Sequence, residues 1–247
     1  MTGLGGWPVN RDRAVLLAGA AAITGVLWAY MVRTAAGVHS HASMDAGALF
    51  AMWAVMMVAM MLPSTLPFVF VFHAEQVRRH AGRASIKSTP FFMGGYFALW
   101  IVFSAGCAAL EQLLHGAALL SPMRSAASPL FAGALLLAAG VYQWTPIKSA
   151  CLRHCRSPLT FLLSDWREGA GGAFRMGVDH GLFCVGCCWM LMLLPFVAGV
   201  MNLRWMAGIT VLLLVEKAAP GGERTARVSG ALLAVAGACV MSFGVAL

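Results

Sequence analysis

Residues 177–199 read GVDHGLFCVGCCWMLMLLPFVAG, a stretch that is long and apolar enough to cross a lipid bilayer. A membrane-spanning helix needs about 20 consecutive, predominantly apolar residues. Of the 247 residues in the chain, 60% are hydrophobic and 11% are charged. Soluble domains carry roughly 25% charged residues, so the composition excludes an ordinary soluble protein. We therefore expect an all-α fold, a polytopic helix bundle with membrane lipid around it.

Similar apolar stretches occur along the whole chain. The sequence predicts seven transmembrane helices, at residues 14–32, 47–72, 91–114, 129–146, 173–199, 203–219 and 228–246. Turn-forming residues such as Ser121-Pro122 and Pro220-Gly221-Gly222 separate them. The first stretch is longer than the apolar core of about 7–15 residues in a signal peptide, so we expect it to remain as a helix. Because no linker divides the chain, we expect one transmembrane domain over residues 1–247.

The basic residues indicate the orientation of the spans. One set of loops and ends is rich in them, with Arg11, Arg13, Arg78, Arg79, Arg83, Lys87, Lys148, Arg153, Arg156, Arg167, Lys217, Arg224 and Arg227. The opposite loops hold only Arg33, Arg124 and Arg204. The positive-inside rule then places the N-terminus in the cytoplasm and the C-terminus outside. Because the basic residues are dispersed over short loops, the net charge of +8 does not indicate a nucleic-acid partner.

The predicted fifth span carries a stripe of soft metal ligands. Side chains three and four residues apart share one face of a helix. Met176, His180, Cys184, Cys187 and Cys188 follow this spacing. Thiolate and thioether groups select Cu(I), and zinc also accepts thiolate and imidazole. The alternative is that these cysteines are small apolar residues that pack helices, as the nearby glycines at 177, 181 and 186 also would.

The predicted second span is rich in methionine. Met52, Met56 and Met60 repeat every four residues, and Met57 and Met61 lie beside them. Thioethers are neutral, so they can hold Cu(I) without burying a charge. The alternative is that these flexible side chains fill a packed core. Two prolines at positions 63 and 67 are expected to interrupt this helix.

Two loops add further candidate ligands. The outer loop before the second span offers His39, His41 and Met44, which could capture a metal at its entrance. On the inner side, Cys151, His154 and Cys155 form a C-x-x-H-C cluster. This cluster is suited to metal transfer rather than to a structural zinc site, which needs four ligands. The alternative is a basic loop with incidental thiols. Glu216 and Lys217 are expected to form an ion pair at the inner surface.

Four segments together resemble the DUF2182 family of predicted metal-binding integral membrane proteins, sometimes labelled copper chaperones. They are MMVAMMLPS (56–64), YQWTPIKSACLRHCRSP (142–158), HGLFCVGCCWMLMLL (180–194) and GVMNLRWMAGITVLLLVEKAAPGG (199–222). The resemblance runs in order from about residue 47 to 222. It implies a bacterial inner-membrane protein in which the Cys, His and Met motifs are the functional part.

These patterns favour a protein that binds, delivers or translocates Cu(I), with zinc and haem as alternative cofactors. A membrane or periplasmic protein would exchange the metal with it. No P-loop glycine pattern indicates ATP use, and we assign no catalytic residues. Three other functions stay open: a transmembrane thiol–disulfide relay, haem binding or assembly through His180, and a structural subunit of a membrane complex.

Overall fold

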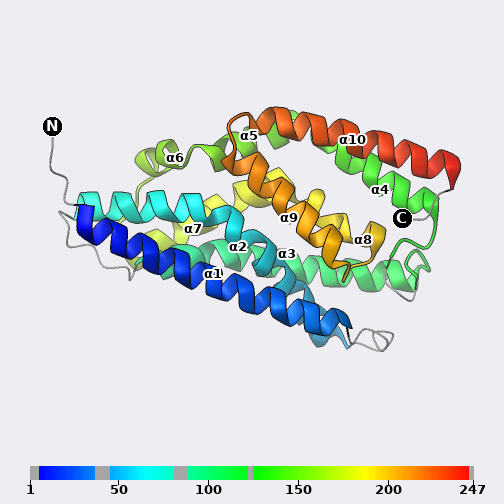
Figure 1. Ribbon diagram of the computed structural model, residues 1–247, viewed down its shortest axis with the longest axis horizontal. Coiled ribbons are helices and arrows are strands. Elements are labelled where there is room, and N and C mark those ends of the chain that lie inside the picture. The colour runs from blue at the N-terminus through cyan, green and yellow to red at the C-terminus, as the bar shows by residue number, and fades with distance from the viewer. Residues whose placement is uncertain (1–5, 37–44, 81–87, 122–124, 245–247) are drawn as a thin grey trace.

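The computed structural model describes residues 6–36, 45–80, 88–121 and 125–244, with side chains described from residue 12 onward. Over these residues the chain is helical, as the sequence predicts, and its β-structure is limited to one bridge between Leu120 and Ala126. The helices are α1 (Gly6–Ala36), α2 (Ala46–Arg79), α3 (Ser88–Gly116), α4 (Pro129–Tyr142), α5 (Pro146–Arg156), α6 (Pro158–Ser164), α7 (Gly169–Cys188), α8 (Pro195–Ala198), α9 (Leu203–Ala218) and α10 (Gly222–Phe243), shown in Figure 1.

The protein is a multi-pass membrane protein. Within the described part of the chain, four helices, α1, α2, α3 and α10, are long and apolar enough to cross a membrane. The number rises to six if two bent pairs each form one span: α4 with α5, bent by 64°, and α7 with Leu191–Ala198, bent by 70°. The predicted span 203–219 corresponds to α9, which has 16 residues. At 1.5 Å per residue these reach about 24 Å, short of the roughly 30 Å hydrocarbon core. The count of seven and the orientation stay predictions.

The second helix is the most buried of the long helices. Of the 18-residue apolar stretch in α2, 61% is buried, against 11%, 28% and 22% of the corresponding stretches in α1, α3 and α10. It remains one α-helix although it contains Pro63 and Pro67, so the prolines do not divide it, and it bends along its length (Figure 1). A proline leaves the carbonyl four residues earlier without its helical donor. For Pro63 that carbonyl belongs to Ala59, and the indole of Trp28 in α1 donates a hydrogen bond to it at 3.4 Å.

Helices α3 and α7 approach so closely that their contact requires glycine. A Cβ atom added at Gly177 would lie 2.0 Å from the carbonyl oxygen of Phe92, and one added at Gly95 would lie 2.0 Å from that of Phe174. Both contacts are with backbone atoms, so no side-chain rotation could relieve them. Small residues permit such an approach between membrane helices, as predicted for Gly177. The crossing brings α3 against the face of α7 that carries the cysteines.

Helices α4 and α10 lie side by side along one edge of the bundle (Figure 1). Their crossing also uses glycines: a Cβ at Gly140 would lie 2.7 Å from the carbonyl oxygen of Gly230. The predicted boundary before α10 is confirmed, because α9 ends at Ala218 and α10 begins at Gly222. Gly221, between them, has a φ of 83°, a backbone conformation that favours glycine.

Candidate metal centre

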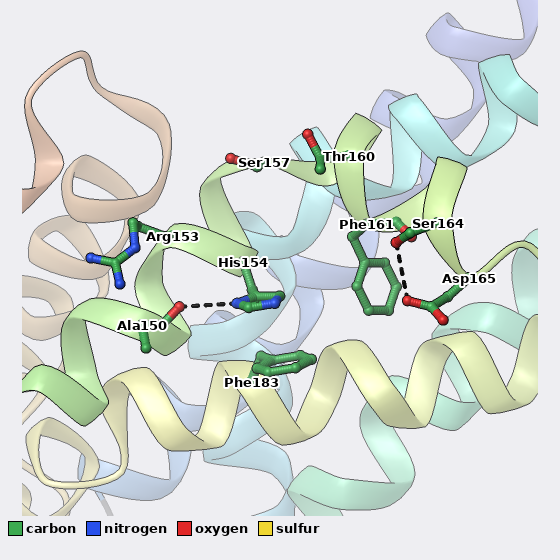
Figure 2. A pocket seen from close by; sticks show the side chains of 9 residues that line it. All are labelled: Ala150, Arg153, His154, Ser157, Thr160, Phe161, Ser164, Asp165 and Phe183. Atoms are coloured by element: carbon green, nitrogen blue, oxygen red, sulfur yellow. Dashed lines mark hydrogen bonds between the residues drawn. The ribbon is translucent and has the colours of Figure 1, made fainter.

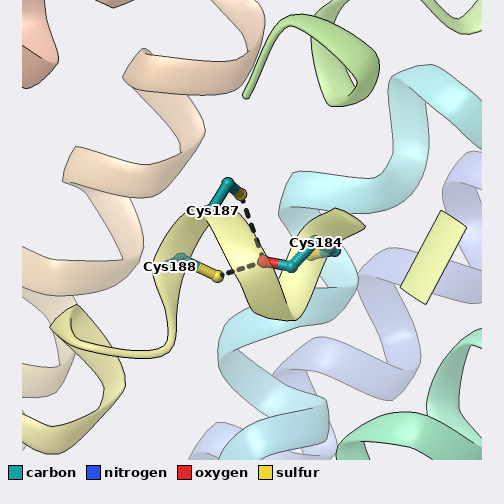
Figure 3. A group of neighbouring side chains, drawn as sticks. All are labelled: Cys184, Cys187 and Cys188. Carbon is teal, nitrogen blue, oxygen red and sulfur yellow. Dashed lines mark hydrogen bonds between the residues drawn. The ribbon is translucent and has the colours of Figure 1, made fainter. Parts of the chain in front are cut away.

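Three cysteine side chains meet at the C-terminal end of α7. Cys184, Cys187 and Cys188 lie on one face of the helix, and their sulfur atoms are all within 4.8 Å of one another. Each residue is at most 1% exposed. The thiols of Cys187 and Cys188 both donate hydrogen bonds to the carbonyl oxygen of Cys184, at 3.1 and 2.9 Å (Figure 3). These bonds hold both thiols close to the turn that carries the third.

The cysteine cluster lies where α7 ends. After Cys188 the chain passes through a 3-10 turn, Leu191–Leu193, into α8. The predicted span 173–199 is therefore apolar as expected but not one continuous helix. Pro195 cannot donate to the carbonyl of Leu191 and clashes with that position in a regular helix. The end of α7 also leaves backbone carbonyls without intrahelical donors, so a polar helix end lies inside the main hydrophobic core.

Helix α5 brings two more thiols against α7. The sulfur of Cys155 lies 3.9 Å from that of Cys187. The sulfur of Cys151 lies so close to Gly186 that a Cβ there would be 2.7 Å from it. The two cysteines are four residues apart and therefore share one face of α5. Cys155 is thus the fourth sulfur at the cluster, contributed by a different helix.

This proximity predicts a specific cross-link. In the metal-free protein a mild thiol oxidant such as diamide is expected to join Cys155 to Cys187, because their sulfurs need only a modest approach to reach the roughly 2.05 Å of a disulfide. Peptide mass spectrometry would detect the linked fragments of α5 and α7. Cys155→Ser should abolish the link, whereas Cys239→Ser, at an exposed position on α10, should leave it intact. If Cys155→Ser still gave as much linkage between α5 and α7, through Cys151, the close approach of Cys155 to Cys187 would be contradicted.

A cation lies directly beside the cluster. The ammonium group of Lys217, at the end of α9, donates to the sulfur of Cys184 at 3.0 Å and to the hydroxyl of Ser64 in α2 at 3.2 Å. The hydroxyl of Tyr96 in α3 is also 3.0 Å from the sulfur of Cys184. The metal-binding form of cysteine is the thiolate, and an ammonium group is a fitting counter-ion for it inside a membrane.

The predicted ion pair between Glu216 and Lys217 is wrong. Glu216 turns away from the cysteines and pairs with Lys148 of α5 at 2.6 Å, and both side chains are 1% exposed. The carboxylate also accepts a hydrogen bond from Gln143 at 2.9 Å. Ser229 of α10 donates to the same carboxylate at 3.3 Å. Adjacent residues of a helix do not face each other, which is why the neighbouring charges have separate partners.

The structure separates His180 and Met176 from the sulfur cluster. The imidazole ring of His180 is 4% exposed and stacks on Phe68, with 3.7 Å between the ring centroids. Tyr96 stacks on it at 5.3 Å. Met176 belongs with Phe68 to a second hydrophobic cluster. The two residues share the face of α7 with the cysteines but are not brought to the same point as the three sulfurs. Coordination of haem by His180 would require Phe68 to move away.

His154 lies in a separate pocket, between α5, α6 and α7 (Figure 2). Its ring stacks parallel to that of Phe183, with centroids 4.1 Å apart. Its Nδ1 atom is 3.1 Å from the carbonyl oxygen of Ala150. The predicted C-x-x-H-C motif is therefore divided along α7: its two cysteines lie beside Gly186 and Cys187, and its histidine lies on Phe183 in this pocket.

The methionines of α2 predicted as ligands lie elsewhere in the molecule. Met56 and Met60 are fully buried in α2, and Met52 is partly buried. His39, His41 and Met44 lie outside the described residues. Their role as ligands stays a prediction.

The geometry of the cluster fits a soft metal ion. Two metal–sulfur bonds of about 2.3 Å each can span at most about 4.6 Å. The sulfur atoms of Cys184, Cys187 and Cys188 are within 4.8 Å of one another, so small side-chain rotations bring all three onto one ion. The surrounding groups, Tyr96 and Lys217, provide a hydroxyl and a counter-charge but no carboxylate. Such a donor set suits a soft cation and not a hard one.

Sequence reasoning missed Lys217, Tyr96 and Ser64 as neighbours of Cys184. One signal pointed to Lys217. Adjacent residues of a helix do not face each other, so Lys217 could not pair with Glu216 and needed a partner on another helix. Tyr96 and Ser64 come from other helices, and no local pattern points to them.

A buried group of thiols inside a multi-pass helix bundle defines the class of this protein, a membrane protein with a cysteine cluster that could hold a soft metal ion. The chain belongs to the PpoB2 family, described as copper chaperones, which it matches over residues 50–240. This match confirms the resemblance to the DUF2182 family. No curated protein and no solved structure matches the chain.

Proposed function

We propose that this protein binds Cu(I) at the cysteine cluster of α7 and delivers it to a partner protein. One observation carries the proposal: the buried sulfurs of Cys184, Cys187 and Cys188 lie within 4.8 Å of one another. Thiolates select both Cu(I) and zinc. Membership of a family described as copper chaperones favours copper as the cargo.

Delivery requires that the ion can leave, and the arrangement of α5 supports this. Cys155 lies 3.9 Å from Cys187 but on another helix, so an ion held by α7 has a neighbouring sulfur to which it can exchange. The partner would be a membrane or periplasmic protein, and the membrane would be the inner membrane of a bacterium. The buried methionines of α2, together with His39, His41 and Met44, are the predicted approach from outside.

The test is the copper content of protein purified in detergent. The wild type is expected to bind Cu(I) with a near-ultraviolet thiolate-to-copper absorption. Cys184→Ser, Cys187→Ser and Cys188→Ser should each weaken this binding by at least about tenfold, because even outer-shell changes cost 10–100-fold in metal affinity. Cys239→Ser is the matched control, since this thiol is exposed on α10, and it should bind copper as the wild type does.

Competition between metals completes the test. Zinc offered in excess should not displace the Cu(I) if the cluster selects the softer ion. A wild-type protein without thiolate-to-copper absorption, or a Cys239→Ser variant that loses as much copper as the cluster variants, would refute the proposal.

A thiol–disulfide relay is the second candidate, favoured by the same distance between Cys155 and Cys187. A relay predicts that this pair is already oxidised in protein isolated without added oxidant. It also predicts a mixed disulfide with a partner when one of the two cysteines is replaced. Reduced thiols and bound copper in the isolated protein support the copper function instead.

A further inference from the structure

A second group of soft ligands surrounds a cavity at another place in the bundle. The cavity has a volume of about 150 Å³ and lies between α1, α2 and the segment before α9. Four methionines line it: Met31 from α1, Met52 and Met56 from α2, and Met201 from the segment between α8 and α9. Of these, only Met52 and Met56 belong to the repeat visible in the sequence.

We propose that this cavity is a second Cu(I) site, formed by the thioethers of Met31, Met52, Met56 and Met201 and independent of the cysteines. The proposal rests on the proposed function in one respect, the identity of the cargo. Thioethers bind Cu(I) and other soft monovalent ions.

The free space distinguishes these methionines from core packing. A methionine that fills a core leaves no room beside it, because protein interiors are close-packed. Met57, on the same helix, is fully buried and does not line the cavity. Met31 and Met56 are 2% and 0% exposed, yet both border about 150 Å³ of space. A water molecule occupies about 30 Å³ of the liquid, so the cavity has room for an ion.

The lining also sets the charge of the ion. Besides the four methionines, the cavity is lined by Tyr30, Thr34, Ala48, Ala51 and Val55, and so by no Asp, Glu, Lys, Arg or His side chain. An uncharged site in a membrane protein provides no counter-charge, and a divalent cation there would carry a large desolvation penalty. Neutral sulfur donors therefore favour Cu(I) over zinc.

The position on α2 relates the cavity to the cysteine cluster. Met56 and Ser64 are eight residues apart on α2, about 12 Å along the helix. Ser64 contacts Lys217, which contacts Cys184. Met60 lies midway between Met56 and Ser64 on the same face of the helix. An ion leaving the cavity thus has another thioether one turn closer to the cluster.

The experiment uses full-length protein in detergent from which the thiol ligands have been removed. In a variant with Cys151, Cys155, Cys184, Cys187 and Cys188 all replaced by Ser, we expect about one Cu(I) per chain to remain, measured by competition with a Cu(I) chelator. Met52→Leu or Met56→Leu in this background should weaken the remaining binding by at least about tenfold. Leucine conserves the volume and costs little stability.

Met57→Leu is the matched control and should retain the copper. Because thioethers bind no protons in this range, the remaining copper should also be held equally at acidic and neutral pH, unlike thiol-bound copper. Loss of all copper in the five-serine variant, or equal effects of Met57→Leu and Met56→Leu, would overturn the second site. Failure of the cysteine proposal looks different: the five serine substitutions would then leave the wild-type copper content unchanged.

Discussion

Replacing Lys148 by Met is expected to destabilise the protein by about 3–5 kcal/mol, because it leaves a carboxylate buried without its counter-charge. Lys148 and Glu216 are 2.6 Å apart, and each is 1% exposed. The remaining partners of the carboxylate, Gln143 and Ser229, provide hydrogen bonds but no charge. The measurement is the temperature at which half of the detergent-solubilised protein loses its monodisperse chromatographic peak.

Two variants separate the charge from the shape. The double variant Lys148→Met/Glu216→Gln removes both charges, so it should recover more than half of the loss, as expected for two residues in one network. Arg153→Met, on the same helix, breaks only the exposed pair with Glu223, 3.9 Å long, and should cost about 0–1 kcal/mol. If Lys148→Met were no worse than Arg153→Met, the buried pair would not be a stabilising contact.

Gly177→Ala is the second substitution with a large expected effect, about 1–3 kcal/mol or more. The added carbon would lie 2.0 Å from the carbonyl oxygen and 2.9 Å from the carbonyl carbon of Phe92. Neither atom can move unless α3 and α7 separate. Separation would also take the hydroxyl of Tyr96 away from Cys184, so copper affinity should fall together with thermal stability.

Gly106→Ala is the matched control, and it should act in the opposite direction. This glycine lies inside α3, where an added Cβ has no atom within 4 Å. Alanine is favoured over glycine in a helix interior by up to about 1 kcal/mol. Gly106→Ala should therefore keep or raise the melting temperature. If both substitutions had the same effect, close packing of α3 on α7 could not be the reason.

Much of the fold follows from local properties of the sequence. Apolar length predicts helices α1, α2, α3 and α10, and the glycines after Pro220 predict the break before α10. The spacing of Cys184, Cys187 and Cys188 predicts that their side chains meet. In each of these cases the residues that matter lie within one helix or one turn. Their spacing in the sequence therefore determines their positions relative to one another in space.

Periodicity fails where distance along the axis matters. It places Met176 and Cys188 within an arc of about 120° around α7, but twelve residues separate them by about 18 Å along it. One ion cannot contact both. The break after Cys188 was equally hidden, because the next proline, Pro195, is seven residues further on and removes only the hydrogen bond to Leu191. Cys155, Tyr96 and Lys217 contact the cysteines of α7 from three other helices. The pattern within a single segment does not predict how the helices of a bundle pack.

The same limit explains the prolines of α2. Pro63 removes one backbone hydrogen bond from α2, and a donor from α1 takes its place. The indole of Trp28 supplies the hydrogen bond that the proline cannot, at 3.4 Å from the carbonyl of Ala59. A helix of 34 residues is therefore maintained by a neighbour as well as by its own backbone.

Two neighbouring charges determine the rotation of helix α9 about its own axis. The apolar side chains of α9 would not favour one rotation over another, because they are distributed around the whole helix. Its last turn carries a carboxylate toward Lys148 and an ammonium group toward Cys184. A rotation by one residue, about 100°, would turn the ammonium group of Lys217 toward that of Lys148. The two opposite charges on the last turn of α9 therefore select one rotation of the helix. This rotation places Lys217 beside the thiol of Cys184.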